Sequence, residues 1–241
     1  MKTSAILLAA GGGTRMRGVV KDKILAPLFG KPVLWHSAKA FIESGVASEL
    51  VFVCRNESQK SEIQKALAPL ISKIPCKFTF GGAERQDSVL NGILAGSEDS
   101  EIVFIHDSAR PLVRPESIRE LCAAALEDGC SVLAAKVVDT IKKVDSDPQN
   151  KKRRRLEDLE RPLLWAMQTP QVFRREIILD CYKKVRESGA KITDDVAAAS
   201  AQGHAITIVE NIHPNTKITS PEDLAIVEFL QQKAKSWEKS E

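Results

Sequence analysis

Short apolar runs alternate with longer amphipathic segments along almost the whole chain. Continuous apolar runs that are too short for a helix predict buried strands. They fall at residues 5–10, 50–54, 77–80, 102–105, 132–138 and 206–209. The segments between them have helical patterns, at residues 32–44, 58–67, 85–94, 115–127, 174–187 and 221–234. Proline near the start and glycine just past the end of several segments fit the usual asymmetry of helix termini.

This alternation predicts an α/β fold of three layers, Rossmann-like, with a mostly parallel sheet and helices on both faces. In such sheets ligands bind beyond the carboxyl ends of the strands. The loops that begin at Gly11, Gly81 and His106 should therefore lie along one edge of the sheet. The interval 137–161 is too long for an ordinary connection, so we expect residues 1–241 to form one domain with residues 137–161 as a protruding arm.

Composition excludes several classes of protein. The 241 residues are 43% hydrophobic and 28% charged, which is ordinary for a globular chain. There is no secretory pattern and no apolar stretch of membrane-spanning length, so we expect a cytoplasmic protein with no membrane partner. Five scattered cysteines without Cys-x-x-Cys spacing favour reduced thiols over zinc ligands.

The net charge of +3 depends on one basic tract, KKRRR at residues 151–155. Outside that tract the chain carries 30 basic and 32 acidic residues. Such a tract either binds nucleic acid or anionic lipid, or lies in a solvated loop. The turn-rich sequence at residues 145–150 favours a solvated loop, so we do not expect a nucleic-acid partner.

The most informative motif follows the first predicted strand, where the chain reads LAAGGGTRM and then reaches Lys23. Glycines allow successive N–H groups to turn around an anion, and Arg15 and Lys23 add two positive charges. A Walker A loop is excluded because no Lys-Ser/Thr follows the glycines. A dinucleotide fingerprint is excluded because Met16 replaces its third glycine. The loop is either a nucleotide phosphate cradle or a glycine-rich turn whose cations face water.

Two more motifs belong to the same predicted edge. GGAERQDSV follows a strand and opens a helix, so it either approaches a flat base closely or is a capped helix start with Asp87 or Ser88 as cap. HDSARP ends another strand. There Asp107 suits a ribose hydroxyl or a magnesium ion, and Arg110 suits a second phosphate. The alternative is an Asp107–Arg110 ion pair that stiffens the turn.

Three later segments contribute further candidates. In LLWAMQTPQVF we expect Trp165 and Phe173 in the core, and Gln168 and Thr169 in contact with substrate. In ITDD, Thr193 or Asp194 is expected to cap a helix. In NTKIT, Lys217 is a candidate phosphate ligand.

In this order, the motifs LAAGGGTRM, GGAERQDSV, HDSARP, LLWAMQTPQVF, ITDD and NTKIT-SPEDL resemble those of the 2-C-methyl-D-erythritol 4-phosphate cytidylyltransferases. The resemblance runs from residue 5 to about residue 230. Its first motif is shared with many sugar nucleotidyltransferases, whereas the combination of HDxARP, TPQxF and NxKIT is typical of far fewer enzymes. The resemblance implies a nucleotidyltransferase fold, and transfer from CTP to methylerythritol phosphate with release of pyrophosphate and a requirement for Mg²⁺.

The resemblance also implies roles for single residues. Arg15 and Lys23 are the implied catalytic residues, which stabilise charge on the α-phosphate and on pyrophosphate. The implied substrate-positioning residues are Arg161, Lys217, Thr140, Arg110 and Thr169. The implied nucleotide-binding residues are Ala9, Ala10, Gly11, Gly12, Gly13, Gly82, Ser88 and Asp107. Asp107 is also the one protein ligand expected for Mg²⁺. The resemblance further implies a homodimer in which each arm carries Thr140 and Arg161 to the other subunit's site.

The residue chemistry agrees with such a transfer. A phosphate oxygen is already an anionic nucleophile, so no general base is needed. Cations and glycine amides supply the positioning and charge stabilisation that in-line phosphoryl transfer requires.

Three features depart from the family pattern. Asp22 stands where the family usually has proline, and its charge is expected to weaken or redirect Lys23. The arm is longer and carries the basic tract. Pro214 stands where some members have an acidic residue, so no second metal carboxylate is predicted.

Other functions stay open at this point. A ribitol 5-phosphate cytidylyltransferase shares most of the motifs, although the Leu-Trp before TPQ favours methylerythritol phosphate. Sugar-1-phosphate and molybdopterin nucleotidyltransferases share only the opening loop. A non-catalytic RNA-binding protein would use the basic tract and release no pyrophosphate.

Overall fold

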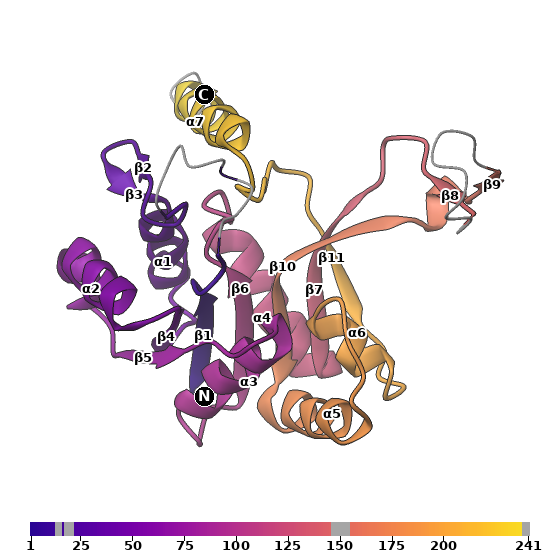
Figure 1. Cartoon of the computed structure of the whole chain (residues 1–241), viewed down its shortest axis with the longest axis horizontal. Helices are drawn as coiled ribbons and strands as arrows, with labels where there is room; N and C mark the ends of the chain where they lie inside the picture. The colour runs from indigo at the N-terminus through magenta and orange to yellow at the C-terminus, as the bar shows by residue number, and fades with distance from the viewer. Residues whose placement is uncertain (13–15, 17–21, 146–154, 238–241) are drawn as a thin grey trace.

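The apolar runs of the sequence form one central sheet in the computed structural model, which describes residues 1–12, 16, 22–145 and 155–237 (Figure 1). The sheet has seven strands in the order β5-β4-β1-β6-β10-β7-β11. They are β1 (Thr3–Leu8), β4 (Glu49–Cys54), β5 (Cys76–Phe80), β6 (Ile102–Asp107), β7 (Cys130–Lys136), β10 (Trp165–Arg174) and β11 (Thr207–Glu210). All are parallel except β10, which is antiparallel to β6 and β7. The six predicted strands and the mostly parallel sheet are confirmed.

The amphipathic segments form helices close to their predicted bounds. They are α1 (Val33–Ser44), α2 (Glu57–Ile71), α3 (Arg85–Ala95), α4 (Pro115–Asp128), α5 (Arg175–Ser188), α6 (Asp195–Ser200) and α7 (Pro221–Trp237). Gly45 and Gly189 end α1 and α5 in the left-handed conformation that glycine adopts without steric cost. The α2 helix continues four residues beyond its predicted end and includes Pro69.

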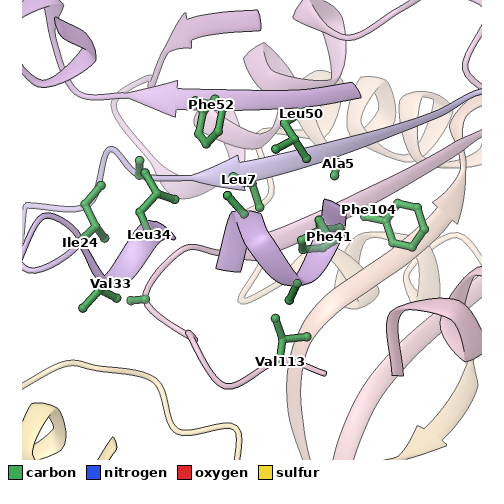
Figure 2. Packing of buried hydrophobic residues seen from close by; sticks show 14 of the residues in the cluster. Ala5, Leu7, Ile24, Val33, Leu34, Phe41, Leu50, Phe52, Phe104 and Val113 are labelled. Carbon is green, nitrogen blue, oxygen red and sulfur yellow. The ribbon is translucent and has the colours of Figure 1, made fainter. Parts of the chain in front are cut away.

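The strands are continuous apolar runs because helices cover both faces of the sheet. On one face, Leu7 and Phe104 pack with Phe41 of α1 (Figure 2). Helices α2 and α4 contribute buried residues to the same cluster. On the other face, Ile6 and Ile105 pack with helices α3, α5 and α6. Successive residues of a strand point to opposite faces, so each strand needs apolar residues at every position. The predicted three-layer arrangement is confirmed.

The β10 strand was not among the predicted strands. It lies between β6 and β7 and contains the segment LLWAMQTPQVF, apart from its first two residues. Its ladder with β7 is interrupted between Met167 and Gln171, where polar residues break the apolar pattern. Phe173 is fully buried as predicted, whereas Trp165 is only half-buried. Trp165 is not a core residue because it lies at the start of the strand, where Lys136 covers its ring at 5.5 Å.

The interval between β7 and β10 leaves the body of the molecule (Figure 1). Its end is an antiparallel hairpin of β8 (Lys142–Val144) and β9 (Leu156–Asp158), and residues 161–163 form a short 3₁₀ turn on the return. All six hairpin residues are exposed. Residues 151–154 of the basic tract lie outside the described residues. A second small hairpin joins β2 (Pro27–Leu28) to β3 (Lys31–Pro32).

Among the described residues, no helix combines the length and apolar character that a membrane span requires.

Candidate active site

A pocket of about 450 Å³ lies at the carboxyl end of the parallel strands, where the loops after β1, β5 and β6 meet. Its lining residues are Leu8, Ala9, Ala10, Gly11, Gly12, Lys23, Ile24, Gly82, Ala83, Glu84, Arg85, Ser88, Asp107, Ala109, Lys217 and Thr219. Seven of the eight residues expected to bind nucleotide are therefore in the lining. The eighth, Gly13, lies outside the described residues, and so does Arg15.

The glycines of the pocket serve different purposes. A Cβ at Gly11 or Gly12 would meet no atom of the described residues within 4 Å, so the space beside these two pocket-lining positions is open. At Gly82 a Cβ would lie 2.3 Å from the Cβ of Asp87, so the close approach to α3 requires glycine. The N–H of Gly82 donates to the Ser88 hydroxyl at 3.0 Å, which fixes this loop against the helix.

The start of α3 has a capping box. The N-cap is Glu84, whose side chain accepts from a backbone N–H of the first turn. In return Asp87 accepts from the Glu84 N–H at 3.0 Å. Asp87 is thus part of the cap, whereas the Ser88 hydroxyl bonds Gly82 and the carbonyl oxygen of Glu84.

Asp107 is the last residue of β6, and two cations converge on its Oδ2 atom. The Lys217 ammonium donates to Oδ2 at 2.6 Å, and the Nε atom of Arg110 lies 3.9 Å away. Burial by itself would raise the pKa of Asp107, but the charges of Lys217, Arg85 and Arg110 outweigh it and hold that pKa below its ordinary value. Asp107 is therefore an ionised carboxylate that orients Lys217 at the pocket wall.

Arg110 and Thr169 lie behind the pocket rather than in its lining. Arg110 donates to the carbonyl oxygen of Asn215 at 2.8 Å, and burial lowers its pKa although Asp107 opposes the shift. The Thr169 hydroxyl accepts from the Asp107 N–H at 3.0 Å and lies 3.1 Å from Nδ1 of His106. These contacts hold the end of β6, so both residues support Asp107 from within the protein. Gln168 likewise accepts from Asn215 and from Asn211.

The pairing of Arg85 with Asp195 is a part of the site that the sequence analysis did not single out. The two terminal nitrogens of the guanidinium, Nη1 and Nη2, donate to the fully buried Asp195 carboxylate, at 3.0 and 2.7 Å. Tyr182 also donates to this carboxylate. A positive charge in the first turn of a helix is unfavourable because it opposes the helix dipole. The position of Arg85 was therefore a sequence signal that this side chain has an acidic partner. Asp194, one residue earlier, caps α6 as predicted.

Thr140 and Arg161 are exposed in the arm and do not line this pocket. The guanidinium of Arg161 donates to the carbonyl oxygen of Val138 at 3.2 Å, which ties the two sides of the arm together near its base. Within one chain the arm extends away from the central sheet (Figure 1).

Lys23 lines the pocket, whereas Asp22, the preceding residue, does not. The Lys23 ammonium donates to the carbonyl oxygen of Ile218 at 3.1 Å, next to Lys217. The Asp22 carboxylate accepts from Arg55 at 3.0 Å and from Gln59 at 2.6 Å. The charge of Asp22 is thus already matched by the guanidinium of Arg55, and the Gln59 amide adds a hydrogen bond.

The pocket offers one oxygen donor of the kind that a magnesium ion takes, the carboxylate of Asp107. The described residues contain no group of three or more His, Cys, Asp or Glu side chains arranged for a metal. Mg²⁺ is commonly bound through one or two carboxylates together with substrate phosphates, and Asp107 supplies one such carboxylate at the pocket wall.

A mostly parallel α/β sheet whose strand ends carry glycine loops, an ionised carboxylate and three basic side chains is typical of nucleotide-binding proteins of the nucleotidyltransferase class. Comparison of the sequence with known protein families narrows this class to one family. Residues 3–233 match the family IspD, described as 2-C-methyl-D-erythritol 4-phosphate cytidylyltransferase, and the chain belongs to this family of enzymes.

Individual relatives agree with this assignment. A protein of that name from Caldanaerobacter subterraneus subsp. tengcongensis is 40% identical over 233 residues, which are 97% of this chain and 100% of the relative. The chloroplastic protein of that name from Oryza sativa subsp. japonica is 39% identical over 227 residues, which are 94% of this chain and 73% of the relative.

Solved structures share the fold. The 4-diphosphocytidyl-2C-methyl-D-erythritol synthase from Anaerococcus prevotii superposes with a TM-score of 0.83 at 24% identity, covering 96% of this chain and 98% of its own. The 2-C-methyl-D-erythritol 4-phosphate cytidylyltransferase from Thermus thermophilus gives a TM-score of 0.75 at 26% identity, covering 96% and 100%.

Proposed function

We propose that this chain transfers CMP from CTP to 2-C-methyl-D-erythritol 4-phosphate, releasing pyrophosphate and forming 4-CDP-2-C-methyl-D-erythritol. The observation that carries the proposal is the pocket itself, together with family membership over residues 3–233. The pocket combines open glycine positions with the ammonium groups of Lys23 and Lys217, and Arg85 also lines it while paired with Asp195. A triphosphate and a second phosphate would need this combination.

The residues of the pocket divide the work by position. The loop around Gly11, Gly12 and Gly82 leaves room for the nucleotide and offers backbone N–H groups. Lys23 lies where it would stabilise the negative charge that develops on the transferred and leaving phosphates. Lys217, oriented by Asp107, would hold the phosphate of the acceptor for attack. The acceptor phosphate oxygen is already anionic, so catalysis rests on positioning and charge stabilisation rather than on proton transfer.

Magnesium is the proposed cofactor. Its oxygen ligands would come mainly from the triphosphate, with Asp107 as the protein ligand. When bound, the ion neutralises phosphate charge in the transition state. Removal of divalent cations with EDTA should abolish transfer, and added Mg²⁺ should restore it. Unchanged turnover in EDTA would contradict the requirement.

The deciding experiment measures pyrophosphate release from CTP and Mg²⁺ with methylerythritol 4-phosphate and ribitol 5-phosphate in parallel. Turnover with the first acceptor alone would establish the proposed reaction. Turnover with the second alone would keep the mechanism and change the substrate. No turnover with either would contradict the proposal.

We also propose a homodimer in which the arm of each subunit completes the site of the other. The arm and its base expose several large apolar side chains, including Val138 at 81% and Leu163 at 72%, and a concentration of such side chains is typical of an interaction surface. Mixing Arg15→Ala chains with Arg161→Ala chains would then regenerate one intact site per hybrid dimer. Partial recovery of activity supports the shared site. No recovery despite demonstrated subunit exchange would contradict it.

A cytoplasmic location is proposed on the basis of the cysteines. All five are free thiols in the structure, as expected in a reducing compartment. Burial raises the pKa of Cys54 to about 12, so this thiol next to the pocket loops is unreactive.

A further inference from the structure

Asp22 directly precedes Lys23, and its side chain and its carbonyl oxygen both accept hydrogen bonds from the backbone that follows. Its Oδ1 atom accepts from the N–H of Ile24 at 3.2 Å, and its carbonyl oxygen accepts from the N–H of Leu25 at 3.2 Å. These two bonds close a turn that has Lys23 as its second residue. The conformation of Asp22 therefore determines where the Lys23 side chain starts.

The Arg55 guanidinium joins this turn to the glycine loop. It donates to Asp22 at 3.0 Å, to the carbonyl oxygen of Gly11 at 3.2 Å, and to that of Ala10 at 3.4 Å. Arg55 directly follows β4, so its backbone is held by the central sheet. The side chain of Arg55, one residue after a central strand, thus binds both Gly11 and Asp22.

Gln59, in the first turn of α2, makes a parallel connection. Its amide nitrogen donates to the carbonyl oxygen of Ala9 at 3.1 Å and to Asp22 at 2.6 Å. Its amide oxygen accepts from the N–H of Arg55 at 2.6 Å. Gln59 is buried and the Asp22 side chain is only 9% exposed. A carboxylate this buried needs its partners, so the arrangement has little freedom to change.

We propose that Asp22, Arg55 and Gln59 are positioning residues for the transfer reaction. By binding one another and the carbonyl oxygens of residues 9–11, they fix the distance between Lys23 and the glycine loop. The negative charge beside Lys23 then serves to locate that lysine rather than to weaken it. This inference rests on the proposed transfer of CMP from CTP.

The expected effect follows from the cost of misplacing a catalytic group. A displacement of about 1 Å can reduce a rate by roughly 10²-fold. Arg55→Met keeps much of the side-chain length and loses all three bonds, so we expect kcat to fall roughly 10- to 100-fold. Arg55→Lys keeps the charge but not the planar fork, so we expect it to recover only part of the loss.

A double-mutant cycle with Lys23 distinguishes positioning from a general structural role. If Arg55 acts through Lys23, Arg55→Met should change kcat by no more than about 2-fold when Lys23 is already alanine, which is near the usual error of additivity. Arg119→Met is the matched control. Arg119 is 46% exposed, pairs with Glu116 and lies in α4 outside the pocket lining, so wild-type kinetics are expected. Asp22→Asn, which keeps the shape of the anchor, covers the case in which Arg55→Met does not fold.

Calorimetric titration with CTP gives a readout that does not depend on turnover. Arg55→Met should weaken CTP binding in the wild-type background and leave it nearly unchanged in the Lys23→Ala background. The inference would be overturned if Arg55→Met weakened CTP binding by the same factor in both backgrounds. It would also be overturned if Arg55→Met and Asp22→Asn both kept the wild-type kcat and CTP affinity. A wild-type chain that binds CTP but transfers to neither acceptor would refute the proposed function, and the binding cycle would still decide the role of Arg55.

Discussion

Removal of the Arg85 guanidinium should destabilise the protein by far more than the loss of an exposed ion pair. Arg85 makes two bonds to Asp195, whose carboxylate is fully buried. Burial lowers the pKa of Arg85 but the charge of Asp195 more than reverses this, so its pKa is raised. In Arg85→Met the Asp195 carboxylate keeps the Tyr182 hydroxyl as a donor and loses its matching charge.

The expected cost is about 3–5 kcal/mol, the range for a buried charge that loses its partner. For a chain of this size that corresponds to roughly a 10 °C fall in the thermal midpoint. Thermal unfolding followed by circular dichroism measures the shift. Arg119→Met is again the control, because an exposed pair contributes only about 0–1 kcal/mol.

A second substitution tests the cause. Adding Asp195→Asn to Arg85→Met removes the uncompensated charge, so the double variant should be more stable than Arg85→Met alone. The reasoning would be refuted if Arg85→Met stayed within about 1 kcal/mol of wild type, well below the range for a buried pair. It would also be refuted if Asp195→Asn destabilised the Arg85→Met variant further.

Three more substitutions test separate parts of the structure. Burial lowers the pKa of His106 from 6.5 to about 4. Between these two pH values the unfolded chain binds a proton at His106 that the folded chain does not bind. The free energy of unfolding should therefore fall by roughly 3 kcal/mol as the pH drops through this window. In urea titrations at several pH values, the free energy of unfolding of His106→Gln should lack this part of the pH dependence. The same pH dependence in the variant and the wild type would contradict the prediction. Gly92→Ala would place a Cβ 2.3 Å from Cγ2 of Ile6 and should cost about 1–3 kcal/mol, despite the better helix propensity of alanine. A higher urea midpoint than that of the wild type would contradict the expected clash between α3 and Ile6. Lys217→Met removes the ammonium that Asp107 orients and should lower kcat/KM for the acceptor by roughly 10²–10³-fold, whereas an unchanged value would exclude Lys217 from the site.

Local sequence was sufficient where neighbouring residues determine an element. The strand β1 was recognisable because its apolar residues are buried on both faces, and α1 because glycine follows its last residue. The helix α6 was foreseen from ITDD, since Asp194 caps it through a bond that spans three residues. These signals act over one or two turns of chain, and so they can be read without a fold.

The β10 strand shows where local reading fails. Its middle is polar, and Thr169 and Gln171 are buried there because their side chains bind other parts of the protein. Thr169 bonds the N–H of Asp107, and Gln171 accepts from the N–H of Asp195. An apolar pattern cannot reveal such a strand, since its burial is compensated by partners distant in sequence.

The sequence by itself determined the layers of the fold, the family, and most of the residues that line the pocket. Only the tertiary structure decided how the charges are paired. Lys217 meets Asp107, and Arg85 meets Asp195, in each case across 110 residues of chain. Asp22 meets Arg55 across 33 residues, which turns an unexpected negative charge into an anchor for Lys23. Local propensities act between close neighbours, whereas these pairs depend on strand order and helix packing, which bring distant segments together at one edge of the sheet.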